Sequence, residues 1–190
     1  VRVKPLPSTN FSSIPVCLND TTCFTDLSTV ATGNITGWSW NFGDPTSGAA
    51  NISNLQNPCH LFTSVGPFSI ILTATSDSGC QSTTTLPATL NAVPVAGFTN
   101  INPCLGFLSV FTDTSNSPIT DPVSSWDWDF GDGSTHETIA NPSHAYSTAG
   151  SYNATLIVTT TNGCKDTILD SVTVYSNPLA GFIAPDSGCA

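Results

Sequence analysis

An aromatic phrase that occurs twice restricts the fold of this chain more than any other feature. Residues 126–133 read Trp-Asp-Trp-Asp-Phe-Gly-Asp-Gly, so aromatic and acidic side chains alternate with a period of two. That period is the pattern of a β-strand with one face in a core and the other in water. The closing Gly-Asp-Gly is typical of a tight turn. Residues 38–44 repeat the phrase as Trp-Ser-Trp-Asn-Phe-Gly-Asp, and the chain is therefore a repeat.

Further matches extend the repeat over most of the sequence. Residues 141–144, Asn-Pro-Ser-His, correspond to Asn-Pro-Cys-His at 57–60, and residues 162–164 correspond to 78–80. Each repeat holds about seven short strand candidates separated by turn residues, which favours a two-sheet antiparallel sandwich. The sequence therefore predicts an all-β protein of two tandem immunoglobulin-like sandwiches.

The repeat also predicts the boundaries of these sandwiches. We expect an extended segment over 1–8, sandwiches over 9–92 and 93–176, and the first strand of an incomplete third repeat over 177–190. Because the linker between repeats is short and Pro178 stiffens it, we expect a rod. In the first repeat the pattern predicts an irregular loop over 43–59 and strands at 11–17, 22–26, 37–42, 68–75 and 80–90.

Composition and charge exclude several classes of function. Thirteen acidic residues stand against three basic ones, a net charge of −10. Such a chain is a poor partner for phosphate backbones and for anionic membrane surfaces. No apolar run approaches the roughly 20 residues that a membrane-spanning helix needs. Since 39% of the residues are hydrophobic, the chain has enough apolar side chains to bury a core and disorder is not expected.

The repeated motif resembles the PKD repeat, an immunoglobulin-like β-sandwich. The second repeat carries the family motif at Trp128, Phe130, Gly131, Asp132, Gly133, Asn141, Pro142, His144, Tyr146, Gly150 and Tyr152. The first repeat departs from it at Pro45, Phe62 and Phe68, so the turn after Asp44 must differ. With its added cysteines the chain is similar to PKD arrays of Bacteroidetes cell-surface and secreted proteins. The resemblance implies a role as a spacer, an adhesin or a filament.

Seven cysteines without a metal-binding spacing predict disulfides in an oxidising compartment. Cys17 and Cys104 occupy one repeat position, and Cys80 and Cys164 occupy another. The pairs expected from this register are Cys17–Cys80 and Cys104–Cys164, and Cys23–Cys59 would be particular to the first repeat. Cys189 falls at the first-strand position of the third repeat, with its partner beyond Ala190. Zinc is disfavoured because no cysteines or histidines cluster.

Three acidic residues of the aromatic phrase are weak candidates for a calcium site. Asp127, Asp129 and Asp132 lie within six residues, and carboxylate oxygens suit that ion. The alternative is that Asp127 and Asp129 form the solvent face of a strand and Asp132 closes a turn. Their counterparts in the first repeat are Ser39, Asn41 and Asp44, so the three acids are not common to both repeats. We expect no other cofactor.

The histidines do not indicate an enzyme. His60 and His144 share one repeat position and have no evident nucleophile, so we expect them to form structural hydrogen bonds. His136 lies in a polar turn, where we expect it to be solvated.

Sugar attachment is a further expectation. In proteins like those the chain resembles, O-glycosylation is expected where Asp precedes Ser or Thr and an apolar residue or Thr follows. Thr21, Thr167 and Ser171 fit that pattern. Asn-x-Ser/Thr acceptors for N-glycosylation stand at Asn10, Asn19, Asn34, Asn51 and Asn153.

The leading hypothesis is a structural segment of an extracellular filament or surface adhesin, with neighbouring repeats and copies of itself as partners. The alternative is a carbohydrate-binding or spacer region of a secreted hydrolase. A carbohydrate binder should display exposed coplanar aromatic rings, whereas Trp38, Trp40, Trp126 and Trp128 are expected to serve the core. An enzyme is a third and weaker hypothesis.

The segment 178–190 raises the question of strand donation between subunits. That mode of assembly needs a first domain without its own opening strand. Phe11 and Cys17 match Phe98 and Cys104, so the first repeat already has that strand. We therefore expect 178–190 to begin a further domain of a longer chain.

Overall fold

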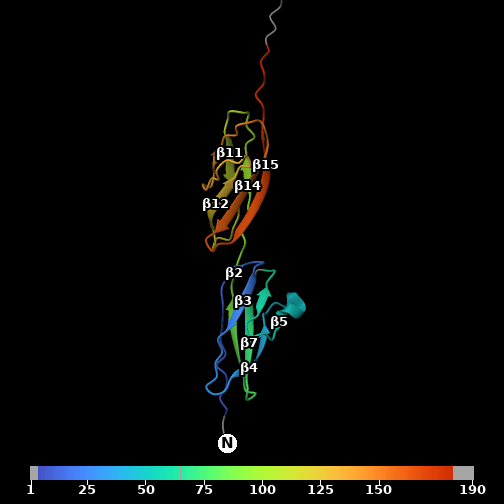
Figure 1. Ribbon diagram of the computed structural model, residues 1–190, viewed down its shortest axis with the longest axis vertical. Helices are drawn as coiled ribbons and strands as arrows, with labels where there is room; N and C mark the ends of the chain where they lie inside the picture. The colour runs from blue at the N-terminus through green and yellow to red at the C-terminus, as the bar shows by residue number, and fades with distance from the viewer. Residues whose placement is uncertain (1–3, 65, 182–190) are drawn as a thin grey trace, which may run out of the picture. The chain divides into compact units, whose positions relative to one another are not determined.

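The computed structural model describes residues 4–64 and 66–181, which form two compact units of β-strands (Figure 1). The division falls between Val93 and Pro94, and Asn162–Cys164 group with the first unit. The one helical element among the described residues is a short 3-10 helix, η1 (Pro45–Asn51). The predicted all-β fold with two tandem sandwiches is confirmed. Within the same residues, no helix combines the length and apolar character needed to span a bilayer.

The first unit consists of two antiparallel sheets and one short parallel pair. One sheet has the strand order β1-β3-β6, the other β5-β4-β7-β8, and β2 pairs with β9. The strands are β1 (Phe11–Ser13), β2 (Val16–Cys17), β3 (Thr21–Asp26), β4 (Ile35–Asn41), β5 (Ile52–Ser53), β6 (Cys59–Leu61), β7 (Phe68–Ser76), β8 (Gln81–Ala88) and β9 (Leu90–Asn91).

The second unit repeats this arrangement. Its sheets have the orders β10-β11-β13 and β12-β14-β15. An isolated parallel bridge between Cys104 and Tyr175 stands where the first unit has the β2–β9 pair. The strands are β10 (Phe98–Asn100), β11 (Ser109–Asp113), β12 (Val123–Asp129), β13 (Ser143–His144), β14 (Gly150–Thr160) and β15 (Lys165–Val174).

The aromatic phrase forms β4 and β12 and supplies the centre of each core, as its alternation predicts. Trp40 and Trp128 are about 1% exposed or less, and the phenyl rings that follow them are equally buried. The indole of Trp128 lies 5.5 Å from Phe111 in the facing sheet, between ring centroids. Burying one such ring stabilises the sandwich by about 1.5–3 kcal/mol. The other tryptophan of each phrase, Trp38 or Trp126, packs only partly against the core.

Two details of the first unit differ from the predicted strands. The expected strand over 11–17 is interrupted at Ile14 and Pro15, because a proline has no N–H to continue the ladder. The chain then crosses to pair β2 with β9 in the parallel direction. The segment 43–59, expected to be irregular, contains η1 and β5, and β6 begins at its last residue.

A glycine after each aromatic strand is required by the backbone. Gly43 and Gly131 have φ of 66° and 75°, in the left-handed region that disfavours a side chain. A Cβ at Gly43 would also stand 2.6 Å from the carbonyl oxygen of Ser69, and one at Gly131 would clash with that of Asn153. These glycines let the chain turn sharply and place the next residue, Asp44 or Asp132, against its own sandwich.

Candidate functional site: the Asp–His turn and the cysteines

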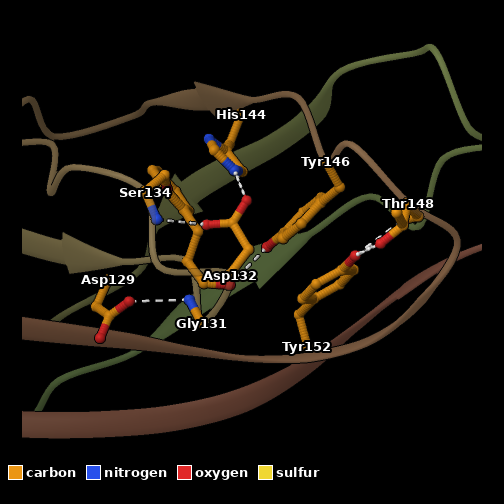
Figure 2. Close-up of polar contacts among 9 residues, drawn as sticks. Asp129, Gly131, Asp132, Ser134, His144, Tyr146, Thr148 and Tyr152 are labelled. Atoms are coloured by element: carbon orange, nitrogen blue, oxygen red, sulfur yellow. Dashed lines mark hydrogen bonds and ion pairs between the residues drawn. The ribbon is translucent and has the colours of Figure 1, made fainter.

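Asp132 and His144 are joined at the turn that follows β12. One carboxylate oxygen of Asp132 accepts the backbone N–H of Ser134 at 3.0 Å, and the other bonds Nε2 of His144 at 2.7 Å (Figure 2). The imidazole is stacked on Phe130, with 4.1 Å between ring centroids and 7° between planes. A motif histidine of β13 therefore closes the turn onto the aromatic strand.

Two tyrosines continue this cluster. The hydroxyl of Tyr146 donates to the carbonyl of Phe130 at 3.1 Å, and its ring meets His144 edge-on at 4.7 Å. Tyr152 stacks on Tyr146 at 4.2 Å, and its hydroxyl donates to the Thr148 carbonyl at 2.8 Å (Figure 2). Burial raises the pKa of Tyr146, so this hydroxyl stays protonated as a hydrogen-bond donor.

The first unit has the same pair in a more enclosed form. Nε2 of His60 lies 3.1 Å from a carboxylate oxygen of Asp44, and the two side chains are 2% and 3% exposed. The ring stacks on Phe42 at 4.5 Å. η1 follows Asp44 directly, and Asn51 at its end accepts the N–H of Asp44 at 2.7 Å. The first repeat has Pro45 where the second has Gly133, and a short 3-10 helix begins at Pro45 in place of the glycine-containing turn.

Hydrogen bonds hold both carboxylates in the ionised form. The hydroxyl of Thr46 is the main cause that lowers the pKa of Asp44, and His60 adds to it against the opposing effect of burial. At Asp132 burial is the largest single influence and opposes ionisation. The donors Ser134 and His144 together outweigh it and lower the pKa of Asp132 to about 2.

Acid is therefore expected to weaken the second sandwich only at low pH. The pKa of Asp132 is about 2 in the fold against an ordinary value of 3.8, so the stability it contributes is complete above about pH 4 and is lost as pH falls toward 2. The check is the free energy of unfolding measured between about pH 5 and about pH 2. Asp132→Asn, the matched control, should lose this part of the pH dependence. An unchanged slope in that variant would contradict the assignment.

The calcium candidates do not converge on one point. Asp129 accepts the N–H of Gly131 at 2.9 Å, and Asp132 is bonded to His144. Asp127 bonds Nδ1 of His136 at 2.7 Å. In the part of the chain that the structure describes, no three acidic, histidine or cysteine side chains are grouped to hold a metal ion. Each carboxylate instead has its own hydrogen-bond donor.

The sequence predicted that His136 is solvated, but the structure shows its ring in contact with two acidic side chains. Its second ring nitrogen lies 3.8 Å from Asp129, so the ring spans both acids on the outer face of β12. About half of each of these side chains remains exposed. Because the backbone of Glu137 pairs with that of Trp128, the loop carrying His136 is held beside the strand. That pairing could not be inferred from the sequence of the turn.

Every tryptophan side chain donates a hydrogen bond inside its own unit. The partly buried Trp38 and Trp126 donate to the carboxylates of Asp26 and Asp113, at 2.6 and 2.7 Å. These pairs were not predicted from the sequence, although Phe-Thr-Asp recurs at 24–26 and 111–113. Trp40 and Trp128 donate to backbone carbonyls at 2.9 and 3.0 Å. The four indoles are thus committed to the fold and do not form an exposed aromatic platform.

The cysteines are paired differently from the prediction in two of three cases. Cys23 and Cys59, opposite each other on β3 and β6, form the expected disulfide. Cys17 is bonded to Cys164, and Cys80 and Cys104 carry free thiols. The predicted pairs Cys17–Cys80 and Cys104–Cys164 are therefore wrong. Cys189 lies outside the described residues.

Strand length explains why the two predicted bridges do not form. Cys17 is opposite Asn91, whereas Cys80 precedes β8. Some ten residues of extended chain separate these points, roughly 30 Å. A disulfide needs Cα atoms within about 7 Å of each other. In the second repeat, the backbone of Cys104 pairs with that of Tyr175 just after β15, whereas Cys164 precedes β15. The length of that strand separates the two cysteines in the same way.

Loss of the Cys23–Cys59 disulfide should weaken the first sandwich alone. The bond closes a loop of 36 residues, and a loop of this size stabilises a fold by about 2–4 kcal/mol. The double substitution of both cysteines by Ser should reduce the protection of first-unit amides from hydrogen exchange. The second unit, with Val110 and Ser143 at the equivalent positions, is the internal control. Equal loss in both units would contradict this expectation.

The candidate glycosylation sites are mostly accessible. Thr21, Thr167 and Ser171 have exposed side chains, as do Asn10, Asn19, Asn34 and Asn153. Asn51 is only partly exposed, and its amide oxygen accepts the N–H of Asp44. A glycan at Asn51 would have to be compatible with that bond, and the other positions carry no such constraint. Use of any of these sites remains a prediction.

The folds and the Asp–His turns define a pair of immunoglobulin-like sandwiches, and comparison with known sequences names the family. The PKD domain family model matches residues 3–90 and 91–174, so the chain belongs to the PKD domain family. Domains of this kind are typically non-catalytic modules. With two disulfides, this membership is consistent with an extracellular structural or adhesion module in a secreted or surface protein.

Solved structures similar to this chain include two PKD domains. The PKD1 domain of Vibrio anguillarum Epp is 29% identical, with 46% of this chain and 99% of that chain covered and a TM-score of 0.42. The PKD1 domain of the Vibrio cholerae metalloprotease PrtV is 35% identical, with coverage of 44% and 98% and a TM-score of 0.39. A 1.5-MDa bacterial ice-binding adhesin is similar in fold alone, at 9% identity, coverage of 93% and 66%, and a TM-score of 0.50.

Proposed function

We propose that this chain is a structural segment of an extracellular filament or surface adhesin, in which it acts as a disulfide-bonded spacer. The observation that carries the proposal is the Cys17–Cys164 disulfide, whose cysteines are 147 residues apart in sequence. Tension applied to the two ends of the chain passes through this bond and bypasses the residues between. A protein that transmits force over a distance benefits from such a covalent path.

The polar groups of the two sandwiches support the same function. The pairs Asp44–His60 and Asp132–His144 recur at one repeat position, and each histidine stacks on a core phenyl ring. Among the described residues, no hydrogen bond joins either histidine to a serine, threonine or cysteine side chain, and the two pairs are suited to fixing a turn. The recurrence of these hydrogen-bonded pairs favours a structural module, with neighbouring repeats or further copies as partners.

Immunogold electron microscopy on cells that carry the sequence tests this function directly. Antibodies against the folded chain should label filaments or the outer surface of intact cells. Pre-immune antibodies and antibody preabsorbed with the protein are the controls. Label confined to the cell interior, or found only on a soluble secreted enzyme, would contradict the proposal.

A glycan array tests the alternative of a carbohydrate-binding region. Because all four indoles donate within their own unit, we expect no saturable binding of the isolated chain to immobilised polysaccharides. Tight and saturable binding would favour the alternative. A reduced and unfolded sample of the same chain identifies nonspecific adsorption.

A further inference from the structure

The Cys17–Cys164 disulfide joins two different positions of the repeat. Cys17 lies beside Asn91, and Cys104 lies beside Tyr175, so the two cysteines occupy the same place in the two repeats. We call this place the first-strand position. Cys80 and Cys164 each stand at the turn before the last long strand of their repeat, one residue before β8 or β15. We call this place the hairpin position.

Each repeat therefore provides one cysteine of each kind. The observed bond uses the first-strand cysteine of the first repeat and the hairpin cysteine of the second. The cysteines left over are Cys80, of the hairpin kind and partly exposed, and Cys104, of the first-strand kind and exposed. Among the described residues, the free thiols of Cys80 and Cys104 are thus complementary, since together they make up the same pair of positions as the bond already formed.

Neither Cys80 nor Cys104 can reach the complementary cysteine position of its own repeat to form a disulfide. Cys80 is separated from the first-strand position by the length of β8, and Cys104 is separated from the hairpin position by the length of β15. Both separations are roughly 30 Å, several times the Cα separation of a disulfide. Cys17 and Cys164 are in any case already bonded to each other.

We infer that Cys80 and Cys104 are disulfide sites for further repeats of the same kind. Cys104 bonds the hairpin cysteine of one further repeat, and Cys80 bonds the first-strand cysteine of another. Each such bond repeats the Cys17–Cys164 connection. The inference rests on that connection and on the strand register, and it does not depend on the filament or adhesin proposal.

Formation of each bond is a two-electron oxidation. Two thiols lose two protons and two electrons and become one disulfide. The electrons and protons pass to the disulfide of a thiol–disulfide oxidoreductase, or of oxidised glutathione, which is reduced to two thiols. Oxidising compartments supply such acceptors. The Cys17–Cys164 and Cys23–Cys59 disulfides form by the same oxidation.

Successive bonds of this kind would overlap along the chain. The loop closed by Cys17 and Cys164 contains Cys104, so the next bond begins before the first loop has ended. Each repeat would then lie partly within two successive disulfide-closed loops. A covalent path of disulfides would run along the array, and no complete sandwich could be pulled open without breaking one.

A chain with one added repeat tests the pairing. In this variant, a second copy of residues 93–176 follows Ser176 in place of 177–190, and the protein is refolded in a glutathione redox buffer. Peptic digestion without reduction, followed by mass spectrometry, should link Cys104 to the hairpin cysteine of the added copy. The native bonds Cys17–Cys164 and Cys23–Cys59 in the same digest serve as the control for correct folding. With those bonds intact, a free Cys104 or any other partner overturns the inference.

Single-thiol variants of the present chain show whether separate chains can also be joined. Cys80→Ser and Cys104→Ser, both with Cys189→Ser, are mixed under the same oxidising conditions. If chains pair in this way, the Cys104–Cys80 heterodimer should exceed either homodimer by about tenfold or more, because exchange depends on access and orientation. Thr135→Cys, added to the chain in which Cys80, Cys104 and Cys189 are all replaced by Ser, supplies an exposed thiol at a different place as the matched control. Homodimers or control dimers as abundant as the heterodimer overturn the inference. If no dimers form but Cys104 is bonded in the extended chain, the disulfide joins repeats of one chain.

Discussion

Stretching the oxidised chain by its two ends is expected to extend only the segments outside the Cys17–Cys164 disulfide. At about 3.6 Å per residue, the 147-residue interval adds roughly 500 Å of contour length once both disulfides are open. The Cys23–Cys59 bond lies within this interval and holds 36 residues, or roughly 130 Å of it. Replacing Cys17 and Cys164 by Ser should therefore release about 400 Å, and subsequent reduction should release the rest.

Single-molecule force spectroscopy on terminally attached chains measures these steps. Cys80, Cys104 and Cys189 are replaced by Ser in all samples, so that disulfide exchange does not complicate the record. Replacing only Cys23 and Cys59 is the matched control, since it leaves the outer loop closed and should add almost no length. If the oxidised chain extends as far as the reduced one, the proposed load-bearing path is wrong.

The second large effect is expected from His60. Its replacement by Ala leaves the carboxylate of Asp44, which is 3% exposed, without its imidazole partner and removes a ring stacked on Phe42. Breaking a buried pair of this kind costs about 3–5 kcal/mol. His144→Ala should cost less, about 1–3 kcal/mol, because Asp132 and His144 are 14% and 15% exposed and water can replace the lost donor.

Hydrogen exchange resolved by residue measures the two losses separately, since each substitution lies in a different sandwich. His136→Ala is the control, because it removes a histidine–aspartate pair at the surface. The half-exposed partners of that pair contribute no more than about 0.5 kcal/mol to the free energy of unfolding. A loss in His144→Ala as large as that in His60→Ala would show that burial does not decide the cost. Little loss in either variant would show that the Asp–His turns do not hold the sandwiches.

Local pattern was sufficient to predict the elements that make up the cores. The alternation in Trp-Asp-Trp-Asp-Phe identified β12 and its inner face, because side chains of a strand alternate between two faces. The glycine after each phrase predicted a turn, and Gly43 and Gly131 do have positive φ. These features depend on neighbouring residues, and a single sequence contains that information.

Contacts between distant segments were predicted only where repetition or composition happened to reveal them. Cys23 and Cys59 stood out because the second repeat has Val110 and Ser143 in their places, and they are paired. The bonds from Trp38 to Asp26 and from Trp126 to Asp113 were missed, although both partners recur. Recurrence shows that two residues are equivalent between repeats, but it does not show which other residue they meet.

The sequence by itself determined the repeat, the all-β class, the PKD family and the aromatic strand at the centre of each core. Only the tertiary structure decided the pairing of Cys17, Cys80, Cys104 and Cys164, and the partners of the candidate calcium ligands. The physical reason is the direction of the strands. The first-strand and hairpin positions of one sandwich lie at opposite ends of its last strand, β8 or β15, and no disulfide spans that length. Strand direction and pairing are set by the sheets as a whole, so the spacing of cysteines in the sequence does not show that the two predicted pairs are out of reach.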